Sequence, residues 1–342
     1  MRRGQRGRRE AGARVAGAIG KRDCTFFLTG QGAGLNILNM KLKFNFIFNI
    51  GARATGLAAL FLCALLAALP AGAQQTPYFV TYDDHMEEPG NLEIGLLNTT
   101  GVRGRGQPAY FAPYMELEYG VKAWWTAELY LEGQSTLNDS TIFTGWRLEN
   151  RWRPLARQHR INPVLYFEYE NINEASRIKK EIVGHAGPST ESNAELRREH
   201  AHELEAKLIL SSQAKGWNIS ENFIVEKNLS ANEGFEFGYA LGVSRPLASL
   251  ASAKNCRFCR ENFVAGLELY GGLGDSRNFG LKRTAHYLAP AISWQLSDGA
   301  TLRFSPAFGL TSNSAPVLIR FGYSYEIRGF RDKLASMFRR KR

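Results

Sequence analysis

Apolar and polar residues alternate along most of the chain after residue 90. The clearest case is VLIRFGYSYEI, residues 317–327, where one face carries Val, Ile, Phe and Tyr and the other carries Leu, Arg, Gly, Ser and Glu. A period of two residues is typical of a β-strand with one apolar face. The pattern leaves open whether that face contacts a protein core or lipid.

Similar alternation predicts about twelve strands in all. They lie at residues 92–99, 110–120, 121–132, 140–152, 161–171, 203–211, 217–227, 235–244, 262–271, 286–296, 301–310 and 317–327. Soluble strands average about five or six residues, whereas a strand that crosses a membrane needs about nine to eleven. Most of the predicted strands have the membrane-crossing length, and the expected fold class is all-β.

The composition of the strand faces favours a membrane barrel. The polar faces mix Gly, Ala and Ser with Glu and Arg, which is typical of a barrel interior and unusual for a soluble exterior. Tryptophans near predicted strand ends suit the aromatic girdles of a membrane interface. These are Trp124, Trp125, Trp146, Trp152, Trp217 and Trp294. We therefore predict an antiparallel transmembrane β-barrel, with a secreted soluble β-protein as the alternative.

The N-terminal region predicts export. A basic stretch from Met40 precedes the apolar run Leu57–Leu69, which ends before the small-residue site Ala71–Ala73. The run is shorter than the roughly 20 residues of a membrane-spanning helix and fits a secretory signal peptide. We expect residues 40–73 to be this signal, and residues 1–39 to be an untranslated or misassigned extension.

The formal net charge of +11 comes from the two ends of the chain. Lys and Arg are concentrated in residues 1–73 and in the C-terminal tail, residues 331–342, while the part between them holds slightly more acidic than basic residues. The charge therefore indicates no nucleic-acid partner. We expect a periplasmic lead-in at residues 74–90, a barrel at 91–330 and a basic tail at 331–342.

Signal, strand pattern and an aromatic-rich final strand, RFGYSYEI, occur together here. In architecture the chain resembles the outer-membrane β-barrel proteins of Gram-negative bacteria, over about residues 91–330. The resemblance implies an integral location among outer-membrane lipid and recognition of the final strand by the barrel-assembly machinery. The sequence departs from the usual form because GFRDKLASMFRRKR follows that strand.

Charged residues predicted to face inward suggest a function. They are Glu116, Glu118, Glu128, Glu132, Glu168, Glu170, Glu205, Glu236, Glu268, Glu326, Arg147, Arg151, Arg303 and Arg320. Eight are expected in particular to line a lumen: Glu116, Glu128, Arg147, Glu168, Glu236, Glu268, Arg303 and Arg320. Charges of both signs can set the field felt by a small solute, or can brace a narrow barrel. We expect a passive channel or transporter for a small solute, with a structural or adhesin-like barrel as the alternative.

Two cysteines, Cys256 and Cys259, follow the signal peptide. In an oxidising compartment a local disulfide is the simplest expectation for such a pair. A zinc site would need two further ligands, and haem attachment needs His rather than Arg260 after the second cysteine.

Other stretches carry groups that could do chemistry. Two could hold a divalent cation, although solvated positions account for both. They are Asp83, Asp84, His85, Glu87 and Glu88, and Glu199, His200, His202 and Glu203. An outer-membrane lipid hydrolase would need a nucleophile beside a histidine such as His286, whose predicted parity faces lipid. No serine pairs with it in the sequence, so we predict no catalytic residue, cofactor or metal.

Overall fold

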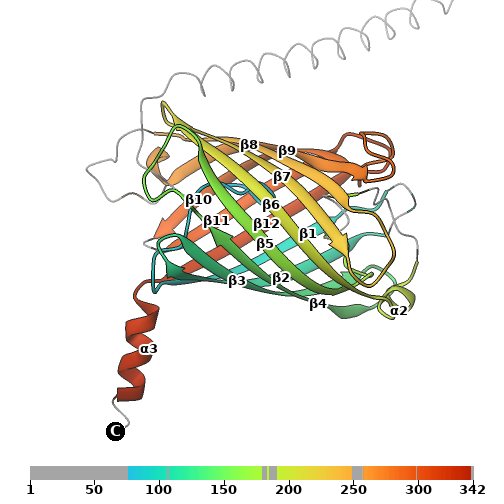
Figure 1. Ribbon diagram of the computed structural model, residues 1–342, viewed down its shortest axis with the longest axis horizontal. Coiled ribbons are helices and arrows are strands. Elements are labelled where there is room, and N and C mark those ends of the chain that lie inside the picture. Colours follow the sequence, from blue (N-terminus) through green and yellow to red (C-terminus); the bar gives the residue numbers. More distant parts are fainter. Residues whose placement is uncertain are drawn as a thin grey trace, which may run out of the picture. The chain divides into compact units, whose positions relative to one another are not determined.

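A computed structural model describes residues 76–104, 106, 108–178, 183–184, 191–248, 256, 258–297 and 299–339. The predicted N-terminal extension, the signal peptide and residues 340–342 lie outside the described residues. The described chain forms a closed barrel of twelve antiparallel strands (Figure 1). This confirms the predicted fold class and strand number.

Each strand pairs with its neighbours in sequence, and the first strand pairs with the last to close the barrel. The strands are β1 (Leu92–Gly101), β2 (Tyr110–Lys122), β3 (Trp125–Thr136), β4 (Thr141–Trp152), β5 (Asn162–Asn173), β6 (His200–Ala214), β7 (Trp217–Asn228), β8 (Glu236–Pro246), β9 (Phe263–Asp275), β10 (His286–Ser297), β11 (Ala300–Gly309) and β12 (Val317–Ile327). The helical elements are α2 (Asn193–Leu196), the 3-10 turn η2 (Arg260–Asn262) and α3 (Phe330–Arg339). Among the described residues, no helix has both the length and the apolar character to cross a membrane.

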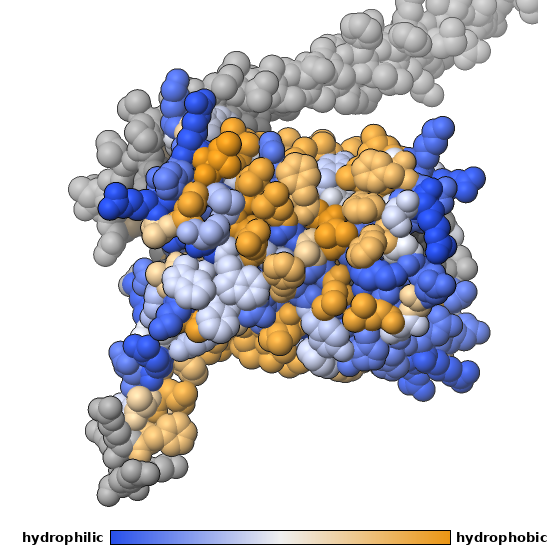
Figure 2. Space-filling view, in the orientation of Figure 1, coloured by the Kyte–Doolittle hydropathy of each residue, from blue (hydrophilic) through white to orange (hydrophobic). Residues whose placement is uncertain are grey.

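The exposed and buried faces of β12 answer the question raised by its sequence. Ile319, Phe321 and Tyr325 are 38%, 42% and 45% exposed, whereas Leu318 and Arg320 are buried. In Figure 2, apolar residues predominate across the middle of the visible barrel wall and hydrophilic ones gather at its ends. The apolar face therefore points outward, as a lipid-facing wall requires.

One predicted turn is misplaced. The predicted strands 110–120 and 121–132 meet at a turn around Gly120, but β2 continues to Lys122 and the turn falls at residues 123–124. The register shifts between Gly120 and Lys122, and a Cβ at Gly120 would clash with the carbonyl oxygen of Glu88. The glycine therefore makes room for a neighbouring segment rather than forming a turn.

That neighbouring segment, residues 76–90, is the lead-in segment, and it lies inside the barrel. Its Val80 packs against the inner faces of β8 to β12, and its Met86 packs against Val164 and Ile209 of β5 and β6. Asp84 and Glu87 are 5% and 4% exposed, which differs from the expected solvated stretch. Small residues on the wall provide the space, since a Cβ at Gly242 would lie 2.7 Å from Cζ of Tyr78.

The two ends of the barrel differ. At the entry end, where β1 begins and β12 ends, most connections are short. At the opposite loop end, the connection between β5 and β6 folds back against the inner wall. There Ser176 lies 3.5 Å from Glu132, the backbone N–H of Arg177 donates to Gln134 at 2.9 Å, and Asn193 contacts Thr136.

Aromatic side chains collect at the entry end. Trp124 and Trp125 stack at the β2–β3 turn, and Trp294 of β10 contacts Phe258 and Phe263. The tryptophans of β4 and β7, at positions 152 and 217, also lie at strand ends there. The tryptophan at position 146 is an exception, because it lies in the middle of β4. The entry end thus carries a girdle of the kind found at a membrane interface.

Candidate functional site

The lead-in segment is held by one carboxylate on β9. Glu268 Oε1 accepts a hydrogen bond from the backbone N–H of Phe79 at 3.0 Å, and its Oε2 accepts from Val80 and Thr81 at 2.9 and 2.8 Å. These residues form no β-ladder, so their buried N–H groups need acceptors from side chains. Glu268, which is itself 0% exposed, supplies them.

Side chains of β7 and β11 continue this anchoring. The amide of Asn222 accepts from the Tyr82 N–H at 2.7 Å and donates to the Tyr82 carbonyl at 2.9 Å. The Tyr78 hydroxyl donates to Asn218 at 3.0 Å, while Arg303 donates to the Tyr78 carbonyl at 3.3 Å. The segment is thus fixed by its backbone to the wall on several sides.

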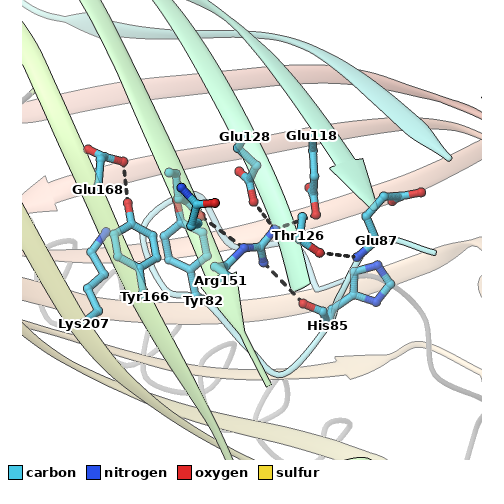
Figure 3. A network of polar contacts seen from close by, with 12 residues as sticks. Tyr82, His85, Glu87, Glu118, Thr126, Glu128, Arg151, Tyr166, Glu168 and Lys207 are labelled. Carbon is cyan, nitrogen blue, oxygen red and sulfur yellow. Dashed lines mark hydrogen bonds and ion pairs between the residues drawn. The ribbon is translucent and has the colours of Figure 1, made fainter. Parts of the chain in front are cut away.

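On the other wall, Arg151 of β4 is the centre of a buried ionic network (Figure 3). Its guanidinium contacts Glu118 at 2.5 Å, Glu149 at 3.1 Å and Glu128. It also donates to the carbonyl of His85 in the lead-in segment at 3.3 Å. Arg151 therefore joins three strands of the wall to the segment.

Two further cations extend the network. Arg147 contacts Glu132 at 2.6 Å and Glu168 at 3.1 Å, and Lys207 contacts Glu205 at 2.8 Å. The Lys207 ammonium also lies 4.0 Å from the ring centre of Tyr166. The network thus spans β2 to β6.

A cavity of about 130 Å³ lies between the lead-in segment and the wall. Its lining includes Glu116, Glu128, Arg147, Arg303 and Arg320, together with Tyr82 of the segment. Because about 10–15 Å³ of such space holds one water, the cavity has room for several. A second cavity of about 40 Å³ lies toward the loop end, between Glu170, Glu226 and Ile178.

The remaining predicted lumen residues lie elsewhere on the inner face. Glu168 accepts from the Tyr166 hydroxyl at 2.5 Å, and Glu268 anchors the lead-in segment. Glu236 lies at the loop end, where a Cβ at Gly184 would clash with its carboxylate. Sequence reasoning missed Lys207, because a lysine on a strand most simply faces solvent, although its parity with Glu205 was a usable signal.

Several carboxylates lie close enough together to hold a cation. Within the described part of the chain, three groups have ligand oxygens within 4.8 Å of one another. They are Glu116, Glu118 and Glu128; Glu168, Glu170 and Glu205; and Glu170, Glu203 and Glu226. The predicted stretch at residues 199–203 does not gather into one site. His202 is exposed on one face of β6, whereas Glu203 is buried on the opposite face.

His286 lies on the outer face, beside two hydroxyls. Its Nε2 is 2.7 Å from Thr284 Oγ1, and its Nδ1 is 3.0 Å from the Tyr239 hydroxyl. Thr284 is 0% exposed and its hydroxyl also lies 2.9 Å from the Leu281 carbonyl. A hydroxyl so buried and so engaged is a poor nucleophile, so the trio is best explained as a structural clasp.

Cys256 and Cys259 are joined by a disulfide next to η2. The Cys256 carbonyl accepts a hydrogen bond from Asn262 at 2.7 Å. The bridge therefore closes a local loop at the entry end.

At the entry end, Glu87 has an unusual environment. The atom Oε1 is buried and has no hydrogen-bond partner among the described residues. Burial, with Glu326, Glu93 and Glu88 nearby, raises the pKa of Glu87 to about 8. Three acids therefore lie near this carboxyl, together with the Asn91 side chain, whose hydrogen bond lowers the pKa of Glu87.

An apolar outer wall, a charged interior and a closed antiparallel sheet define the class of this chain, which is a transmembrane β-barrel of the outer-membrane type. No protein-family model matches the chain, and no curated protein matches its sequence.

Several solved structures are similar to it. The KdgM porin is 7% identical with a TM-score of 0.42, over 68% of this chain and 98% of that chain. The COG4313 outer membrane channel from Pseudomonas putida F1 is 10% identical with a TM-score of 0.48, over 73% and 100%. The NanC porin is 10% identical with a TM-score of 0.44, over 68% and 100%.

Proposed function

We propose that the chain is a passive channel for small solutes in the outer membrane of a Gram-negative bacterium. The observation that carries the proposal is the charged cavity of about 130 Å³ between the lead-in segment and the wall, which has room for several waters. A barrel whose only role was structural would gain more stability from a dry apolar interior than from buried ion pairs. Charges that line a water-filled lumen instead bind and orient solutes.

In this proposal the lead-in segment is the gate. It crosses the lumen from Val80 on one wall to Met86 on the other, so a solute can pass only when the segment moves. Most of its anchors are polar, and they lie on separate strands. Such contacts can exchange with water more readily than a packed apolar core.

The asymmetry of the barrel supports an orientation. Short turns lie on the periplasmic side of outer-membrane barrels and longer loops lie outside. The entry end would then face the periplasm, although the β8–β9 connection there is long. Export by the predicted signal peptide and insertion through the final strand by the assembly machinery belong to the same proposal. Mass spectrometry of the mature N-terminus tests the cleavage after Ala73.

A structural barrel without transport is the second candidate, because the lead-in segment and the Arg151 network fill so much of the lumen. Conductance in planar bilayers separates the two. We expect brief openings from the purified protein, and larger, steady currents after deletion of residues 77–89. A folded deletion variant that passes no current would contradict the channel and favour the structural barrel.

A further inference from the structure

A row of glutamates crosses the sheet, one on each of nine successive strands. In the strand register, every member lies directly opposite the next. The members are Glu326 (β12), Glu93 (β1), Glu118 (β2), Glu128 (β3), Glu149 (β4), Glu168 (β5), Glu205 (β6), Glu226 (β7) and Glu236 (β8). This set is here named the acidic row.

The acidic row connects the two ends of the barrel. Glu326 and Glu93 lie at the entry end, one residue from the end of β12 and one from the start of β1. Glu226 and Glu236 lie at the loop end, near the end of β7 and at the start of β8. Because strands in a barrel are tilted, a row of directly opposed residues climbs as it goes round. The carboxylates therefore wind from one mouth to the other.

Stability alone does not account for this arrangement. Like charges placed directly opposite each other on adjacent strands are destabilising. Arg151 contacts Glu118, Glu128 and Glu149, while Arg147 contacts Glu168. Lys207 contacts Glu205, and Arg328 contacts Glu326, so these four cations face six of the nine glutamates. A sheet that keeps nine opposed glutamates violates the rule for stability, and such violations occur at functional sites.

A second observation points to a ligand. Glu87, which is 4% exposed, lies next to the first two members of the acidic row, Glu93 and Glu326. Its Oε1 has no hydrogen-bond partner in the described part of the chain, and in Figure 3 its carboxylate points away from the Arg151 guanidinium. A buried carboxylate among other carboxylates is satisfied best by a cation. Oxygen ligands of this kind favour hard divalent ions.

We propose that the acidic row is a cation path, and that Glu87 is the first ligand for a divalent cation at its entry end. Of the two neighbouring members of the row, Glu326 is already engaged by Asn91 at 2.6 Å and by Arg328 at 3.2 Å. The carboxylate groups whose oxygens lie within 4.8 Å of one another provide further positions along the row, through Glu128, Glu205 and their neighbours. The inference rests on the proposed channel and adds to it the class of solute.

The first test is the reversal potential of the protein in a planar bilayer under a KCl gradient. We expect a K⁺ over Cl⁻ permeability ratio on the order of 5 or more, as rings of acidic side chains produce in cation channels. E93Q and E226Q should each lower the ratio several-fold. E221Q is the matched control, because Glu221 lies on β7 with Glu226 but on the exposed face, and should leave the ratio unchanged.

Calcium binding is tested independently by calorimetry on the folded protein. We expect E87Q to weaken Ca²⁺ binding at least about tenfold, in line with the loss of one carboxylate ligand, and E221Q to leave it unchanged. Current without cation selectivity would overturn the inference while leaving the channel intact. Absence of current with Ca²⁺ binding that depends on Glu87 would contradict the channel but keep the site. Absence of Glu87-dependent Ca²⁺ binding would overturn the site.

Discussion

The side-chain amide of Asn222 pairs with the backbone of Tyr82 as a neighbouring strand would. It accepts a hydrogen bond from the Tyr82 N–H at 2.7 Å and donates one to the Tyr82 carbonyl at 2.9 Å. The side-chain amide thereby replaces the missing ladder partner of a buried backbone. N222A should remove two hydrogen bonds of about 1 kcal/mol each and speed amide exchange in residues 77–90 roughly tenfold or more. N98A, on the exposed face of β1, is the control and should change nothing there.

Glu268 offers the sharpest test of the gate. E268Q replaces one carboxylate oxygen by a donor that faces backbone N–H groups, so at least one of the three hydrogen bonds is lost and the rest weaken. We expect the open probability in planar bilayers to rise at least several-fold. An unchanged open probability in a folded E268Q barrel would show that this anchor does not hold the gate.

A substitution at Gly242 tests the same gate by filling the space that the lead-in segment occupies. G242V places a side chain where Tyr78 now packs, since even a Cβ would lie 2.7 Å from Cζ of that ring. The lead-in segment should leave its seat, and a cysteine introduced at Val80 should become reactive toward a membrane-impermeant maleimide. Labelling at the wild-type rate would mean that the tyrosine can move aside.

Arg151 should be essential to the stability of the barrel. R151M leaves Glu118, Glu128 and Glu149 buried without their shared cation, which costs on the order of 3–5 kcal/mol when one partner of a buried pair is removed. The temperature at which the folded band is lost on a semi-native gel should fall. Replacing Arg153, which donates to the backbone carbonyls of Asp84 in the lead-in segment and Ala123 in the β2–β3 turn, should have a smaller effect.

The raised pKa of Glu87 predicts a gate that depends on pH. Since the pKa is about 8 in the docked segment and near its usual value when exposed, docking is most stable below about pH 4.5 and weakens as the pH rises through 8. Open probability should therefore increase from pH 6 to pH 9. The groups around Glu87 are the acids Glu88, Glu93 and Glu326 and the side-chain amide of Asn91, and E87Q should flatten the profile.

The outer wall can be tested without any assumption about transport. F321R places a charge on the exposed face of β12, where a lipid-facing arginine costs about 2–4 kcal/mol near the middle of the bilayer. Folding into lipid vesicles should fall accordingly, whereas F321L should fold like the wild type. Equal folding of both variants would contradict contact with lipid at this position.

The alternation of residue types was sufficient to predict the barrel, because lipid outside and charge inside impose a period of two on every strand. The same alternation places Arg303 and Arg320 on the inner face of the barrel, where both line the cavity beside the lead-in segment. It did not predict the turn after β2, since a glycine that avoids Glu88 looks the same in sequence as a glycine that turns the chain.

The contacts inside the barrel could not be predicted from the sequence, for a different reason. The segment YFVTYDDHMEE has no regular periodicity, and its partners Glu268 and Asn222 lie far along the chain. Which strands oppose each other in register also depends on every turn length between them. The inward glutamates could be predicted singly, whereas their alignment into a row could not.

The enclosed position of the lead-in segment constrains the order in which the barrel is assembled. Phe79 and Glu268 are 189 positions apart, so their contact forms only after β9 has been built. The wall is completed where β1 meets β12. A segment directly attached to β1 is threaded most easily while that seam is still open, and it can serve as a template around which the later strands curl. When β1 and β12 pair, the barrel then encloses the segment with which its folding began.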